Sequence, residues 1–163
     1  SRNLPVIESA RLFALVNVAM QDSVQTAQAS KFVYQLCGPV HAIQGGGEDM
    51  NPATDADPTW MPLLPTPPYP SYAGNMACIG AGSATALARF FGSNDALVSI
   101  QWSSTDNINF VVRSFPGFWQ VAEHQAASRE YGGIHYHFDT TAAQESCIKV
   151  GNYVYANYMR PKN

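Results

Sequence analysis

The chain has few charged residues, and it has no long apolar run. Only 13% of its 163 residues are charged, while 46% are hydrophobic; in a typical globular protein about a quarter of the residues carry charge. So little charge indicates a surface that is partly covered, by a companion chain, by further copies of this chain or by a missing part of the same protein. The longest apolar stretch, Leu12 to Met20, is interrupted by Asn17. It is far shorter than the roughly 18 residues that span a bilayer, so the sequence argues against a membrane span.

Positive charge is scarce as well. Nine Lys and Arg residues against twelve Asp and Glu residues give a net charge of −3. Without a basic field, nucleic acid is excluded as the expected partner. The length fits one domain with a substantial core, and we expect residues 1–163 to form a single domain.

Cysteine is also rare, and the chain lacks an initiating methionine. Cys37, Cys78 and Cys147 cannot all pair with one another. One disulfide with one free thiol and three free thiols are both open, and no pair has the spacing of metal ligands. The chain starts at Ser1 and enters a helical pattern almost at once. This start predicts a processed or excised chain, and an exported protein whose leader has been removed is favoured.

Helical spacing governs the N-terminal part. Asn3-Leu4-Pro5 predicts a helix start, and residues 6–35 show apolar residues at helical intervals, frequent alanine and no glycine. We expect one or two long helices here, buried on more than one side and ended by Cys37-Gly38-Pro39. Residues 44–71 hold seven of the eleven prolines. They predict an ordered extended loop, and loops of this length are usually functional or lie across another surface.

The second half is mainly helical too. Alanine, glycine and serine dominate residues 73–91, which predicts a central helix that its neighbours approach closely. Residues 96–112 begin with a β-branched stretch and predict a short strand or an extended loop. Further helices are expected at 117–131 and, with Thr140 or Thr141 as the cap, up to about Tyr158. The predicted class is all-α, a helical bundle with a long Pro-rich loop and at most a short β element.

Residues 128–139 have the composition of a site. They contain an arginine, two histidines and an aspartate, with two glycines between two predicted helices. Glycines let a backbone approach a ligand closely, and the guanidinium of Arg129 suits an oxyanion. His135 and Asp139 are four residues apart, so on a helical turn the carboxylate could fix the imidazole tautomer. The pattern predicts an oxyanion site; the alternative is a helix–loop–helix corner whose polar groups cap helix ends.

Four stretches follow one another in a distinctive order: Ala10–Leu15, Asp57–Leu64, Thr66–Tyr72 and Ser128–Asp139. In order and spacing they resemble the vanadium-dependent haloperoxidase branch of the type 2 phosphatidic acid phosphatase (PAP2) superfamily. The resemblance covers nearly the whole chain, but only the C-terminal part of such a domain, because family members carry further helices upstream. It implies a helical bundle of that type with a pocket for vanadate or phosphate.

The resemblance also implies how that pocket is built. Its first segment is Lys, six residues, Arg-Pro; its second is Pro-Ser-Gly-His; its third is Ser-Arg, five residues, His, three residues, Asp. In the family, the Lys and both Arg hold the oxyanion, and the second-segment His is an acid/base group. The third-segment His bonds vanadium or attacks phosphorus, and the Asp orients it. This chain keeps the third segment in full, which assigns these roles to Arg129, His135 and Asp139.

The first two segments depart from the family pattern. Lys31 is followed by six residues and then Gly38-Pro39, so glycine stands where the arginine is expected. Ungapped alignment places residues 73–76 on Pro-Ser-Gly-His, so Met76 replaces the acid/base histidine. The residues that remain as oxyanion-binding candidates are Lys31, Arg129, Gly74 and Asn75. His41, three residues beyond Gly38, is the candidate to substitute for a missing group.

The cost of these departures in binding free energy and in reaction rate can be predicted. A lost arginine in a buried pocket is worth about 2–5 kcal/mol, and a lost acid/base group about 10² to 10⁴ in rate. The resulting hypothesis is a degenerate family member without ordinary turnover, a structural or binding subunit with weak affinity for vanadate and no other cofactor. The alternative is an enzyme of altered chemistry centred on His135, with Lys31 and Arg129 as electrostatic clamps. A third possibility is that a companion chain from the same processed protein restores the pocket.

Overall fold

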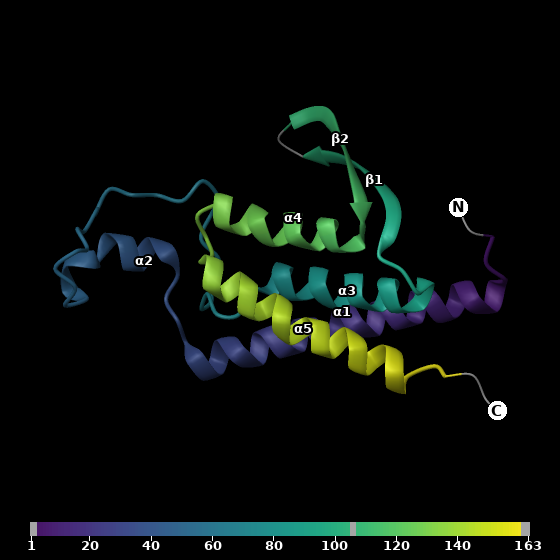
Figure 1. Cartoon of the computed structure of the whole chain (residues 1–163). Helices are drawn as coiled ribbons and strands as arrows, with labels where there is room; N and C mark the ends of the chain where they lie inside the picture. Colours follow the sequence, from purple (N-terminus) through teal and green to yellow (C-terminus); the bar gives the residue numbers. More distant parts are fainter. Residues whose placement is uncertain (1–2, 105–106, 161–163) are drawn as a thin grey trace.

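Helices dominate the part of the chain that the computed structural model describes, residues 3–104 and 107–160. The elements are α1 (Val6–Tyr34), α2 (Pro39–Gln44), the 3-10 helix η1 (Gly46–Glu48), α3 (Asn75–Phe91), β1 (Asp95–Ser104), β2 (Asn107–Gly117), α4 (Phe118–Tyr131) and α5 (His137–Asn157). Helices α1, α3, α4 and α5 form a bundle, and α2 lies beyond one end of it (Figure 1). The predicted all-α class is confirmed. None of the described helices is long and apolar enough to cross a membrane.

Helix α3 lies at the centre of the bundle and packs against α1, α4 and α5, as its small residues predict. A Cβ atom on Gly80 would lie 3.2 Å from the Cα of Ala122 in α4. A Cβ atom on Gly82 would lie 3.2 Å from the carbonyl oxygen of Ala19 in α1. On the α5 side, a Cβ atom on Gly151 would lie 2.7 Å from the Gly82 carbonyl oxygen. Small residues therefore set the spacing between these helices.

Helix α1 buries a single stripe of its surface. The buried residues recur every four positions and are Leu15, Ala19, Ser23, Ala27 and Lys31. Apolar residues on its other faces are exposed, including Phe13 at 69% and Phe32 at 75% of their surface. The prediction of burial on more than one side is therefore wrong, because α1 packs only along the face that meets α3 and α5.

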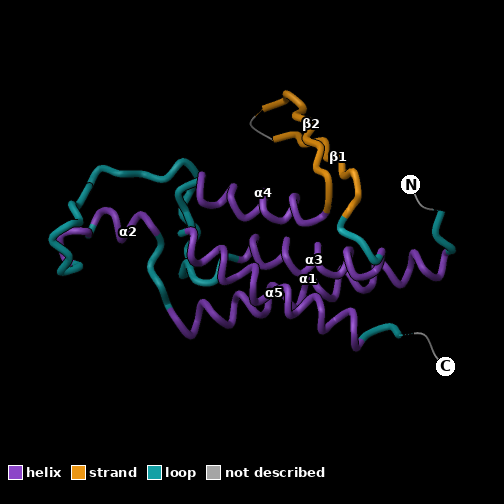
Figure 2. The backbone as a smooth tube through the Cα atoms, viewed as in Figure 1, coloured by secondary structure: helices purple, strands orange, loops and turns teal. Residues whose placement is uncertain are grey.

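The Pro-rich segment is an extended loop that runs from α2 back to the bundle, as the teal tube shows (Figure 2). Its start is fixed by a hydrogen bond of 3.0 Å from the Asp57 amide to the Ile43 carbonyl. Its middle reaches the corner between α4 and α5, where the Leu64 amide donates to the Gly132 carbonyl at 3.0 Å. The predicted extended loop is confirmed, but it is not packed throughout, because Met61 and Leu63 are 72% and 82% exposed.

Three predicted boundaries need correction. Pro39 does not end the first helical unit: α1 ends at Tyr34, and Pro39 is the first residue of α2, where a missing N–H is harmless. Helix α5 begins at His137 with Tyr136 as its N-cap, so neither Thr140 nor Thr141 caps it. Of the ambiguous residues 96–112, those that the structure describes lie in the antiparallel strands β1 and β2 and not in one short strand.

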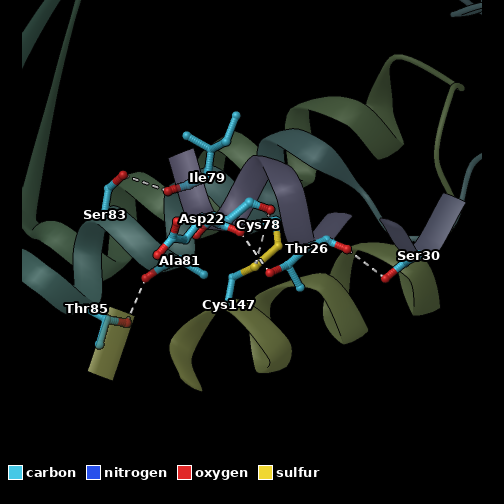
Figure 3. Close-up of a disulfide and its surroundings, with 10 residues drawn as sticks. Asp22, Thr26, Ser30, Cys78, Ile79, Ala81, Ser83, Thr85 and Cys147 are labelled. Carbon is cyan, nitrogen blue, oxygen red and sulfur yellow. Dashed lines mark hydrogen bonds between the residues drawn. A yellow bond between two sulfur atoms is a disulfide. The ribbon is translucent and has the colours of Figure 1, made fainter. Parts of the chain in front are cut away.

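Cys78 of α3 and Cys147 of α5 form a disulfide, and Cys37 is free and exposed. Of the two cysteine alternatives, one disulfide with one free thiol is therefore correct. Figure 3 shows the sulfur–sulfur bond inside the bundle, close to Thr26 of α1. Both half-cystines are fully buried in a core made mostly of alanine. The bond joins two helices whose first residues lie next to the predicted site.

Candidate oxyanion site

His135 and Asp139 form a buried hydrogen-bonded pair at the corner between α4 and α5. The imidazole Nδ1 lies 3.0 Å from the carboxylate Oδ1, and the two side chains are 4% and 0% exposed. The predicted contact is confirmed, although His135 precedes α5 and does not lie on a helical turn. Asp139 also accepts a 3.3 Å hydrogen bond from the Tyr136 amide at the helix start. The carboxylate thus both caps the helix and orients the imidazole.

Ser71 is a third member of this buried group, and it is absent from the predicted site residues. Its hydroxyl donates to Oδ2 of Asp139 and lies 3.1 Å from Nδ1 of His135. A serine in a proline-rich loop is typical of a turn, and this one is 64 residues from His135. The signal that could have found it is the dipeptide Pro70-Ser71, which repeats the Pro-Ser of the second family segment three residues early.

Counting hydrogens determines which nitrogen of His135 carries one. Ser71 uses its single hydroxyl hydrogen on Asp139, and an ionised carboxylate only accepts. The Nδ1 atom therefore faces acceptors alone: the two oxygens of Asp139 at 3.0 and 3.2 Å and the Ser71 oxygen at 3.1 Å. It must be the N–H nitrogen, so in the neutral ring Nε2 keeps a free lone pair. No hydrogen bond from the described residues reaches Nε2, which leaves it available to a ligand.

Lys31 reaches the same region from α1, but its ammonium group is engaged with the protein. Its Nζ atom donates to the carbonyl oxygens of Pro70 at 2.7 Å and Ser71 at 2.8 Å. The ring centroid of Tyr69 lies 5.0 Å from the same nitrogen, within the range of a cation–π interaction. The residue is 1% exposed. Burial lowers the pKa of Lys31 to about 8, although the nearby Asp139 carboxylate opposes this shift.

Two predicted site residues carry buried polar atoms that lack a hydrogen-bond partner within the described part of the chain. They are Nε of Arg129, in the last turn of α4, and Oδ1 of Asn75, the first residue of α3. A buried polar group without a partner costs about 1–3 kcal/mol. Each atom would therefore be stabilised by a bound group, an acceptor for Arg129 and a donor for Asn75.

The positions that depart from the family pattern are not compensated locally. A Cβ atom on Gly38 would meet nothing within 4 Å, so the backbone here has open space where a side chain would begin. Met76 is 37% exposed, and its sulfur lies 4.0 Å from Nε2 of Gln125. The amide of Gly74 donates to the Asp139 carbonyl at 3.3 Å. That N–H is therefore already used inside the protein, contrary to the predicted oxyanion-binding role of Gly74.

The glycines of the α4–α5 corner serve the fold. A Cβ atom on Gly132 would lie 2.6 Å from Cδ1 of Leu64, and one on Gly133 would lie 3.1 Å from Cα of Pro62. Gly133 also has a φ of +73°, a conformation that favours glycine. The sequence pattern predicts close approach of a ligand here, but the partner that comes close is the Pro-rich loop.

The remaining histidines do not join the pair. His41 is exposed on α2, which lies away from the bundle (Figure 1), so the structure does not bring the predicted rescue residue to the site. His124 contacts Arg113 at 3.1 Å, and His137 contacts Glu130 at 3.1 Å.

Tyr136 links the corner to the loop after α1. Its hydroxyl donates to the Cys37 carbonyl at 3.2 Å, next to the open position at Gly38. Burial, followed by the influence of Cys37 and Asp139, raises the pKa of Tyr136 to about 12. The hydroxyl is therefore a stable hydrogen-bond donor at neutral pH.

Comparison with known proteins gives one family and one architecture. Residues 11–163 match the family model described as the VCPO second helical-bundle domain. The vanadium chloroperoxidase of Curvularia inaequalis is 23% identical over 182 aligned residues. The alignment covers 85% of this chain and 29% of that protein. The structure of a bacterial vanadium-dependent iodoperoxidase matches with a TM-score of 0.74 and 26% identity, over 90% of this chain and 33% of that one.

A second solved structure agrees in fold. An apo-type bacterial vanadium-dependent chloroperoxidase superposes with a TM-score of 0.75 at 16% identity, over 89% of this chain and 35% of that one. The chain thus spans about a third of the length of the relatives it matches.

Proposed function

The chain belongs to the family of the VCPO second helical-bundle domain, and we propose that it is a member without ordinary haloperoxidase or phosphatase turnover. In this proposal it serves as a structural or binding part of a larger assembly. The observation that carries the proposal is the position of Lys31, whose ammonium group donates to the Pro70 and Ser71 carbonyls. The residue expected to hold the oxyanion instead holds the protein's own loop.

The residues present do not fit a tightly held vanadate. A concentrated negative charge must be met by cations and hydrogen bonds when it is buried, because desolvation otherwise dominates. The Lys31 ammonium and the Gly74 amide already donate to protein carbonyls, and Gly38 supplies no guanidinium. What remains is the third N–H donor of Lys31, the guanidinium of Arg129 and Nε2 of His135. We assign no chemical step to vanadate in this chain.

Exposed apolar side chains support a role in an assembly. Helix α1 leaves Val6, Ile7, Phe13, Phe32 and Val33 between 69% and 87% exposed. In the Pro-rich loop, Leu63 is 82% exposed. Large exposed apolar residues in this number are typical of surfaces that other protein covers. We propose that the cover is a companion chain or another copy of this chain.

The disulfide supports a proposal about the compartment. Disulfides form and persist in oxidising environments and are rare in the cytosol. The buried Cys78–Cys147 bond supports the proposal that the protein works outside the cytosol.

An activity assay tests the main proposal. The purified protein, incubated with vanadate, hydrogen peroxide and bromide, should not brominate a dye above the rate of a heat-inactivated sample. It should also fail to hydrolyse a chromogenic phosphate ester. Turnover in either assay that disappears in His135→Ala contradicts the proposal.

A second candidate function is an enzyme of altered chemistry centred on His135. The observation in its favour is the free Nε2 lone pair on a ring that Asp139 and Ser71 hold in one tautomer. A basic nitrogen held in this way would suit proton abstraction from, or attack on, a small substrate. A screen of small organic acids and phosphate esters, with His135→Ala as the control, tests it. A hit with the same rate in both proteins removes this candidate.

A further inference from the structure

Ser71 lies where three segments of the protein meet. It belongs to the end of the Pro-rich loop and is 3% exposed. Its amide donates to the Leu36 carbonyl at 2.8 Å, and its own carbonyl accepts from Nζ of Lys31 at 2.8 Å. The backbone of Ser71 is therefore held from both sides by the C-terminal end of α1 and the residues that follow it.

The side chain of Ser71 points to the other partner, the corner between α4 and α5. Its hydroxyl donates to Oδ2 of Asp139 and offers its oxygen to Nδ1–H of His135 at 3.1 Å. The terminal torsion of an aspartate is broad and permits rotation of the carboxylate plane. A donor on Oδ2 and an imidazole on Oδ1 together restrict that rotation. Ser71 thereby adds a restraint that Asp139 alone does not supply.

We propose that Ser71 is a positioning residue for His135 and that Lys31 acts as its anchor in place of an oxyanion clamp. Through this chain of contacts, α1 controls the orientation of an imidazole that lies more than 100 residues later in the sequence. The inference deepens the proposed function, because it concerns the orientation of Nε2 in the same site. It does not require turnover.

Nuclear magnetic resonance on protein labelled with nitrogen-15 in histidine provides the test. In the unaltered protein, the ring nitrogens should show a hydrogen on Nδ1 and none on Nε2 near neutral pH. The Nδ1–H signal should also exchange slowly with water, because the group is buried and hydrogen-bonded.

Ser71→Ala should speed the exchange of this hydrogen by about tenfold relative to the backbone amides of α3 and α5, which equals 1.4 kcal/mol. Normalising to the core amides separates a local effect from a loss of global stability. Ser71→Thr keeps the hydroxyl and should restore slow exchange. Cysteine is close to serine in size but is a weaker donor, so the exchange rate in Ser71→Cys should lie between those of the alanine and threonine variants. This variant replaces Ser71→Ala in the test if the alanine variant does not fold.

Ser83→Ala is the matched control, because Ser83 donates only to the Ile79 carbonyl within α3 (Figure 3). It should leave the His135 signals unchanged. Lys31→Met should speed the exchange as Ser71→Ala does. The positioning role of Ser71 is overturned if Ser71→Ala and Ser71→Cys both keep the Nδ1–H exchange rate of the unaltered protein. The anchoring role of Lys31 is overturned if Lys31→Met keeps that rate.

Adding inorganic phosphate to the same samples tests the proposed function separately. A shift of the Nε2 signal with phosphate would report binding at the site, whereas the exchange of Nδ1–H reports positioning in its absence. A failure of the positioning role of Ser71 can therefore be distinguished from a failure of the proposed function.

Discussion

The ammonium group of Lys31 donates a 2.8 Å hydrogen bond to the carbonyl oxygen of Ser71. In a pocket built to bind an oxyanion, that donor would point to the ligand. Here it joins α1 to the Pro-rich loop instead, and the loop in turn contacts the His135–Asp139 pair.

The buried position of Lys31 predicts how stability depends on pH. Its pKa is lowered to about 8 in the folded protein, from 10.5. Between these values the unfolded state binds more protons than the folded state, so the free energy of unfolding rises with pH. The rise is at most about 1.4 kcal/mol per pH unit for one group. Urea unfolding at pH 7.5 to 10, compared with Lys31→Met, should show this slope only in the unaltered protein; equal slopes would contradict the account.

Removing Asp139 should destabilise the fold strongly. The carboxylate accepts hydrogen bonds from the Ser71 hydroxyl, the His135 ring and the Tyr136 amide. Loss of a buried partner of this kind costs about 3–5 kcal/mol, so Asp139→Ala should lower the free energy of unfolding by that amount. Glu145→Ala, at an exposed position of the same helix, should change it by less than about 0.5 kcal/mol. Chemical unfolding measures both, and similar small losses would refute the central role of Asp139.

Glycine positions should differ in their tolerance of a side chain. Gly133→Ala adds a Cβ 3.1 Å from Pro62 at a φ of +73°, and strain of this kind costs about 1–3 kcal/mol. Gly38→Ala meets open space at a φ of −73°. Its effect on the free energy of unfolding should be below about 0.5 kcal/mol, because the lower entropy of the unfolded chain is offset by alanine being a poorer N-cap for α2 than glycine. Thermal unfolding of the two variants gives the comparison. A Gly133→Ala protein as stable as the original would show that the loop does not pack there as described.

The disulfide should contribute a large part of the stability. The Cys78–Cys147 bond spans a sequence separation of 69, and bonds of this kind typically contribute about 2–4 kcal/mol. The double variant Cys78→Ala and Cys147→Ala should lose at least this much, while Cys37→Ala, at the exposed thiol, should lose almost nothing. Denaturant unfolding under non-reducing conditions distinguishes the two, and equal stability of all three proteins would contradict the structure.

The local features of the fold were predictable, and the nonlocal ones were not. Apolar periodicity located α1, the run of small residues located the central α3, and the four-residue spacing of His135 and Asp139 predicted their contact. Ser71 escaped notice because its partners lie 64 and 68 residues away, and the Pro70-Ser71 dipeptide does not by itself say which distant residues it contacts. The glycine corner was assigned to a ligand for the same reason: its partner, the loop at Pro62, is distant in sequence.

Apolar spacing also could not tell which faces of α1 are covered. Phe13 and Phe32 recur with the helical pattern as Leu15 and Ala19 do, yet the first two are exposed and the last two are buried. The pattern reports hydrophobicity, whereas burial depends on which neighbours are present. The same limit applies to Lys31: its place in the motif was readable, but the direction of its ammonium group was not.

The most direct test of the central claim is a calorimetric titration of vanadate into the unaltered protein and into the variant Gly38→Arg with Met76→His. The account predicts no saturable binding at micromolar vanadate in the unaltered protein. In the variant, a restored guanidinium is worth about 2–5 kcal/mol, so binding should tighten by at least tenfold. Micromolar binding by the unaltered protein that is lost in His135→Ala would contradict the account, because it would show that the pocket works as it stands.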